Sequence, residues 1–112
     1  MAIEAIRLST RAMCPVILLS EGSLGNAAEP WLVPDIASIP EIKVSHPQSN
    51  GEPFMPYLRD SETMARQWAT PGTEGLEHRI GGLEKEDITG TVCYDNDNHA
   101  RMTLNRSEKI QK

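Results

Sequence analysis

The sequence predicts an α/β fold that is incomplete, and two observations predict it. An amphipathic helical pattern is followed at once by an unbroken aliphatic run, which is typical of half an α/β unit. Seven of the eight prolines then lie between positions 30 and 71, in a segment with no regular hydrophobic period. We therefore divide the chain into residues 1–31 (helix, buried strand and loop), residues 32–95 (an extended connecting segment) and residues 96–112 (a C-terminal helix).

The first helix and the strand are justified by the spacing of apolar residues. From Ile3 to Met13 these residues recur on one helical face, and Pro15 disfavours the helical conformation at the residue before it. Residues 16–19 read Val-Ile-Leu-Leu without polar alternation, which is typical of a strand buried on both faces of a parallel sheet. Only residues 42–44 and 91–94 offer weak further strands, so the sheet is expected to be incomplete.

The C-terminal helix is predicted from Met102, Leu104 and Ile110, with Asp97 or Asn98 as its N-terminal cap. Residues 59–66 are expected to form one or two helical turns capped by Asp60 or Ser61. The first helix lacks a capping residue and the last lacks a glycine stop. We therefore expect the chain to be part of a larger protein.

The proline-rich segment is predicted to be an arm that lies across another surface. Structureless stretches beyond about 12 to 15 residues are uncommon in compact domains, and free linkers are poor in large apolar side chains. This segment instead carries Trp31, Phe54, Tyr57 and Trp68. We interpret these four aromatic residues as interface anchors, on the rest of the same subunit or on a partner chain.

Composition excludes several classes of function. The net charge of -5 has the wrong sign for binding nucleic acid or an anionic membrane. Cys14 and Cys93 are far apart and form no metal-binding motif, so no metal site is predicted. The sequence has no visible secretory signal and no apolar run near the roughly 18 residues that a membrane span needs, so we expect a cytoplasmic location.

One charged stretch, residues 77–87, has the residue types of a general-base site or an anion clamp. Glu77, His78, Arg79 and Glu84 surround a pair of glycines there. A solvated turn with local ion pairs explains the same residues and is the favoured interpretation. His46 and His99 have no ligand at metal-binding spacing, and the sequence predicts no catalytic residue.

Several strings of residues resemble the alpha subunit of the 2-oxoacid:ferredoxin oxidoreductases, most closely the 2-oxoglutarate type. Residues 15–22 and 26–31 resemble the end of its pyrimidine-binding domain, and residues 51–57 and 71–84 the segment that follows. The string Gly-Leu-Glu-His-Arg-Ile-Gly-Gly-Leu-Glu at residues 75–84 is the most specific. The sequence departs from the family at Ser23 and Gly25, where tyrosine and alanine are usual.

The resemblance implies a fragment of a thiamine-diphosphate-binding α/β domain. It implies oxidative decarboxylation of a 2-oxoacid to an acyl-coenzyme A, with electrons passing through iron-sulfur clusters to ferredoxin. The activating carboxylate would lie earlier in the alpha subunit, and the diphosphate and cluster sites in the beta subunit. No cofactor is therefore expected on this chain alone, and the implied partners are the beta subunit and the remainder of the alpha subunit.

Three hypotheses follow. The leading one is an alpha-subunit fragment that is inactive alone and supplies structural surface, with Glu77, His78, Arg79 and Glu84 added to the four aromatic residues as interface candidates. The second is a non-catalytic interaction module of the same ancestry that wraps a partner. The third is an independent small enzyme that uses His78, Arg79 and Glu84.

Overall fold

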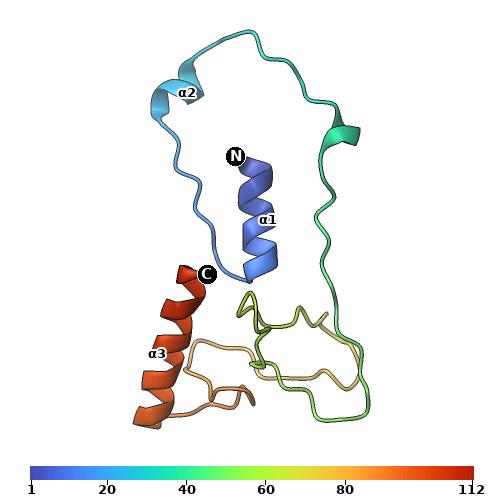
Figure 1. Cartoon of the computed structure of the whole chain (residues 1–112), viewed down its shortest axis with the longest axis vertical. Coiled ribbons are helices and arrows are strands. Elements are labelled where there is room, and N and C mark those ends of the chain that lie inside the picture. The colour runs from blue at the N-terminus through green and yellow to red at the C-terminus, as the bar shows by residue number, and fades with distance from the viewer.

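The computed structural model describes residues 1–112 and contains helices joined by long irregular segments (Figure 1). The elements in chain order are α1 (Ala2–Ala12), α2 (Gly22–Asn26), the 3-10 helix η1 (Ile36–Ser38) and α3 (Asn96–Gln111). There is no β-strand, and pairing between extended segments is limited to isolated bridges, which join Tyr57 to Ile88, Arg59 to Arg66 and Lys85 to Val92. None of the helices combines the length and apolar content that crossing a membrane requires.

The molecule is much less compact than its length allows. Its radius of gyration is 18.4 Å and its principal extents are 55 × 32 × 24 Å, whereas a compact chain of this length has a radius of gyration of about 13 Å. Figure 1 shows the reason, since residues 15–45 form one wide loop that passes around the far end of α1 and returns. Residues 46–112 form a small unit that we call the base, in which loops pack against α3.

Helix α1 forms where the apolar spacing predicts a helix. It ends at Ala12 because Met13 adopts a left-handed conformation, with φ of 48°, and its N–H bonds to the carbonyl of Ser9. No side chain caps its first turn, as expected from the residues around Met1. Pro15 follows two residues later and prevents continuation.

The predicted strand after α1 does not form in this chain. Residues 15–20 are extended but paired with nothing, and Ile17 and Leu19 are 81% and 88% exposed. Residues 42–44 are also unpaired, and residues 91–94 contribute one bridge, at Val92. An aliphatic run indicates that a segment must be buried. In a parallel sheet neighbouring strands bury it, and residues 1–112 supply no such strands. The α/β class therefore stays a prediction about a larger subunit.

Helix α3 and the loop at residues 85–92 form the best-packed part of the chain. Asn98 is buried, accepting a hydrogen bond from the N–H of Asp87 (3.0 Å) and donating one to the carbonyl of Lys85 (3.0 Å). Met102, 3% exposed, lies one turn further along the same face. The predicted cap is wrong by position: Asp95 caps the helix, accepting from the N–H of Asn98 at 2.8 Å.

Residues 59–66 form a closed turn instead of the predicted helical turns. The Oδ1 atom of Asp60 accepts bonds from the N–H of Thr63 (2.8 Å), the hydroxyl of Thr63 (2.9 Å) and the N–H of Glu62 (3.1 Å). These bonds, led by the Thr63 N–H, lower the pKa of the Asp60 carboxyl. Asp60 thus organises the segment as predicted. A backbone bridge between Arg59 and Arg66 closes the segment into a loop.

Candidate functional site

The largest feature that the chain presents to its surroundings is an uncovered apolar arm, which we define as residues 15–36. Its large apolar side chains are mostly more than two-thirds exposed: Ile17 (81%), Leu19 (88%), Leu24 (70%), Trp31 (73%), Leu32 (91%), Val33 (72%) and Ile36 (81%). Soluble monomers rarely expose a contiguous apolar surface of this kind, and such surfaces mark interaction sites. Figure 1 shows the arm leaving the end of α1 and then running away from the packed base as a single open segment.

Local hydrogen bonds shape the arm without covering it. The short helix α2 begins after Glu21, whose carboxylate accepts a bond from the hydroxyl of Ser23 at 2.7 Å. Asn26 bonds back to the carbonyl of Gly22 at 3.0 Å. Neither bond covers the apolar side chain of Leu24, which stays exposed between them.

The four predicted aromatic anchors lie in different surroundings. Trp31 is on the arm and exposed, whereas Phe54 packs edge-to-face on His78 with ring centroids 5.3 Å apart. Arg66 lies over the ring of Tyr57 at 4.4 Å. Trp68 donates its indole N–H to the carbonyl of Thr10 at 2.8 Å, which ties α1 to the base, and it remains 39% exposed.

Glu84 joins the segment 77–87 to helix α3. Its carboxylate lies 2.5 Å from Nδ1 of His99 and accepts a bond from Arg106 at 3.1 Å. The hydrogen bond with His99, followed by that with Arg106, lowers the pKa of Glu84. Sequence reasoning missed these partners because they lie 15 and 22 residues away, and only the docking of α3 brings them together.

The residues of the predicted small-enzyme site do not share one pocket. His78 and Arg79 line a pocket of about 370 Å³ together with Glu77, whereas Glu84 lines a separate pocket beside α3. Nδ1 of His78 is held by the carbonyl of Leu76 at 2.8 Å, and Arg79 is exposed without an ion pair. The arrangement does not place a base, a cation and a carboxylate around one reacting atom.

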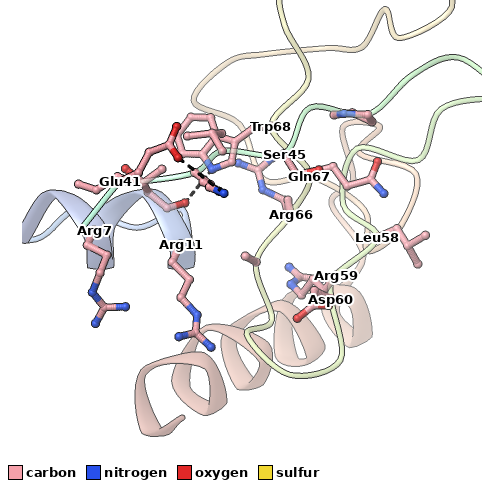
Figure 2. Close-up of a pocket in the computed structure, with 16 residues that line it drawn as sticks. Arg7, Arg11, Glu41, Ser45, Leu58, Arg59, Asp60, Arg66, Gln67 and Trp68 are labelled. Carbon is pink, nitrogen blue, oxygen red and sulfur yellow. Dashed lines mark hydrogen bonds and ion pairs between the residues drawn. The ribbon is translucent and has the colours of Figure 1, made fainter. Parts of the chain in front are cut away.

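A basic pocket of about 500 Å³ lies where the base meets α1 (Figure 2). Arg7 and Arg11 extend from one side of α1. Arg66 and Trp68 come from the base, and the indole of Trp68 reaches the carbonyl of Thr10 on α1. Most of its charges are already compensated. Arg7 forms an ion pair with Glu4, Lys43 lies 3.6 Å from Glu41, and Arg59 forms an ion pair with Asp87. We interpret this pocket as the seam between α1 and the base.

The chain does not fit the cofactors that the family resemblance implies. No three His, Cys, Asp or Glu side chains gather closely enough to hold a metal ion, and Cys14 and Cys93 are both free thiols. The aminopyrimidine of thiamine diphosphate is activated by a carboxylate in a closed site. No Asp or Glu side chain here is fully buried, and the least exposed pair, Arg59 with Asp87, is an internal ion pair.

These features define the class of protein. A small packed base with a long exposed apolar arm is the architecture of a subunit segment, in which residues of other segments cover the arm. The chain is 50% identical over 109 residues, or 97% of its length, to the 2-oxoglutarate oxidoreductase subunit KorA of Mycobacterium tuberculosis. It spans only 16% of that relative. This similarity confirms the resemblance to the alpha subunit of the 2-oxoglutarate type. No protein-family model and no solved structure matches the chain.

Proposed function

We propose that this chain is a structural segment of the alpha subunit of a 2-oxoglutarate:ferredoxin oxidoreductase. The similarity to KorA supports the choice of enzyme. The observation that carries the structural role is the accessible surface of this chain, 9151 Å². A compact protein of the same mass exposes about 6,100 Å². The excess of roughly 3,000 Å² is of the size that obligate subunit interfaces bury.

The arm supplies much of this excess and is the surface that docks. Its aliphatic side chains and Trp31 gain most from burial, at about 25 cal/mol for each Å² of apolar surface removed from water. The prolines in and after it, including Pro30 and Pro34, restrict the free chain and so reduce the entropy lost on docking. The occupants of this surface are the remainder of the alpha subunit and the beta subunit.

In this proposal the chain contributes surface and other parts of the enzyme contribute chemistry. The complete enzyme oxidatively decarboxylates 2-oxoglutarate, with thiamine diphosphate as cofactor, coenzyme A as acyl acceptor and ferredoxin as electron acceptor. The cofactor and the iron-sulfur clusters are held by other segments, because the residues of this chain fit neither. The isolated chain is accordingly inactive and binds no thiamine diphosphate.

The proposal is tested by complementation of the relative. The full 112-residue chain is co-expressed with M. tuberculosis KorA lacking the matching segment, and with the other subunits of that enzyme. We expect the chain to co-purify with the truncated subunit and to restore 2-oxoglutarate-dependent reduction of an electron acceptor. Co-purification without activity would favour the non-catalytic interaction module, and failure to associate would contradict both.

A variant of the arm makes this test specific. Leu19→Asp with Leu32→Asp places two charges on side chains that are 88% and 91% exposed in the free chain, so the chain's own structure is preserved. Both co-purification and activity are expected to be lost, because each carboxylate would be buried unpaired on docking. The matched control is Asn50→Asp, an exposed change outside the arm that keeps the side-chain oxygen bonded to the N–H of Glu52.

A further inference from the structure

A second pocket, of about 550 Å³, lies between the end of α1 and the last turns of α3. Lys109 on α3 donates a hydrogen bond to the carbonyl of Met13 at 3.3 Å and so joins the two helices across it. Figure 1 shows these C-terminal helix ends lying next to each other. The pocket touches the arm only at its first residue, Pro15, and the exposed side chains of the arm that the proposed function uses do not line it.

The lining of this pocket is strongly basic in a chain that is acidic overall. Five cationic side chains line it, namely Arg59, Arg66, Lys85, Arg106 and Lys109, against the single carboxylate of Glu84. The net charge of the whole chain is -5. Positive charge therefore gathers at this pocket, and also at the basic pocket beside α1, which shares Arg59 and Arg66 with it.

Three of the five cations have no carboxylate partner, whereas Arg106 is paired with Glu84 and Arg59 with Asp87. Arg66 lies over the Tyr57 ring, and Lys109 bonds only to a backbone carbonyl. Lys85 is 3% exposed, and its ammonium donates to the carbonyls of Gly81, at 3.0 Å, and Leu83.

Like charges crowd one another in this pocket. Burial lowers the pKa of the Lys109 ammonium, and the charges of Arg66 and Arg59 lower it further, while Cys14 opposes them. Burying a cation without a counter-ion is unfavourable, and the site gains from any anion that enters. A buried lysine without a carboxylate and repulsion among its neighbours are two separate observations, and both indicate a missing negative charge.

We propose that this pocket binds the phosphate group of a small organic molecule, held by Arg66, Lys85 and Lys109. A phosphate carries close to two negative charges and three acceptor oxygens, which matches three cationic donors better than a single carboxylate does. Leu83, Met102 and Ile110 supply apolar wall beside them. An organic substituent on the phosphate has this wall to lie against, which free phosphate lacks.

The test is a titration of the full chain, followed by amide chemical shifts at constant ionic strength. The probes are phenyl phosphate, inorganic phosphate and benzoate, with sodium chloride keeping the ionic strength fixed because screening weakens any exposed charge interaction. Phenyl phosphate is expected to saturate and to shift amides near residues 13–15, 82–85 and 105–110. Inorganic phosphate is expected to shift the same amides with weaker affinity, and benzoate to bind weakest. Tighter binding of inorganic phosphate than of phenyl phosphate would identify a site for inorganic anions. It would overturn the proposal that the ligand is an organic phosphate.

Variants show whether the named residues hold the phosphate. Lys109→Gln and Arg66→Gln are each expected to weaken phenyl phosphate binding by about tenfold, the size of a lost charged hydrogen bond. Lys109→Arg keeps the charge and should retain most of the affinity. Arg101→Gln on the same helix, exposed and outside the pocket, is the matched control and should bind like the wild type. The proposal is overturned if no probe saturates, or if the control weakens binding as much as the pocket variants.

Discussion

At the scale of single residues, backbone conformation decides the loop that carries α3. Gly90 is buried and has φ of 70°, in the left-handed region that glycine favours. A Cβ atom on it would lie 2.6 Å from Cγ of Pro56 and 3.0 Å from Cδ2 of Tyr57. Its N–H closes the turn by bonding to the carbonyl of Glu86 at 3.1 Å. The absence of a side chain is therefore required here for two independent reasons.

Gly90→Ala is predicted to destabilise the base by about 2 kcal/mol, the combined size of left-handed strain and overpacking. Urea unfolding followed by the circular dichroism of the helices measures it. Gly82→Ala is the control, because Gly82 has no neighbour within 4 Å of an added Cβ and no positive φ, and it should change stability by only a few tenths of a kcal/mol. Equal effects at both positions would contradict the packing seen around Gly90.

The role of a residue was predictable from the sequence where the residue bonds to its near neighbours in the chain. The four residues Asp-Asn-Asp-Asn at 95–98 predict a helix start but not which of them caps it, since each can accept from a backbone N–H. The structure selects Asp95 because Asn98 is committed to the loop at residues 85–87. That commitment is a tertiary contact, which local spacing does not contain.

At the scale of elements, periodicity predicted α1 and α3 because a helical face is a local property. It failed for residues 16–19, since an aliphatic run predicts burial without naming what buries it. It also missed the attachment of α3, which depends on Glu84 meeting His99 and Arg106 from another part of the chain. Attachments of this kind form only when the chain folds, and residues far apart in the sequence carry no pattern that links them.

The docking of α3 is predicted to weaken in acid. The pKa of Glu84 lies below its usual 4.5 in the folded chain. A carboxyl with a lowered folded pKa stabilises the fold above its unfolded pKa, and this stabilisation is lost as the pH falls through the lowered folded value. Urea midpoints at several pH values from neutral to below 4 should therefore decrease on acidification.

The variant that checks this is Glu84→Gln, which should show a smaller decrease in midpoint between neutral and acid pH than the wild type. High salt should reduce the difference between the two chains, because the contact is solvent-accessible. Glu77→Gln is the matched control, since Glu77 is exposed and makes no hydrogen bond or ion pair within the chain. A wild-type midpoint that is as pH-dependent as that of Glu84→Gln would contradict the role given to this carboxylate.

At the scale of the whole molecule, the sequence contains more apolar surface than its own residues can cover. Residues 54–112 bury a few side chains, among them Leu76 and Met102, while residues 15–36 bury none. The prediction of an arm was possible because prolines and large apolar side chains together exclude both a compact domain and a free linker. Which surface the arm meets was not predictable from residues alone, because complementarity belongs to two surfaces and only one is in this sequence.

The two tryptophans report the state of this arm separately. In the free chain, Trp31 is 73% exposed and Trp68 39%, with the indole of Trp68 bonded to Thr10. We predict that acrylamide quenches Trp31 strongly and Trp68 weakly, measured on the variants Trp68→Phe and Trp31→Phe respectively. On assembly with the truncated relative, Trp31 should become protected because docking buries it, while Trp68 should change little because it already packs against α1. Protection of Trp31 in the free chain would mean that the arm folds back on its own base, and the excess surface would then need no partner.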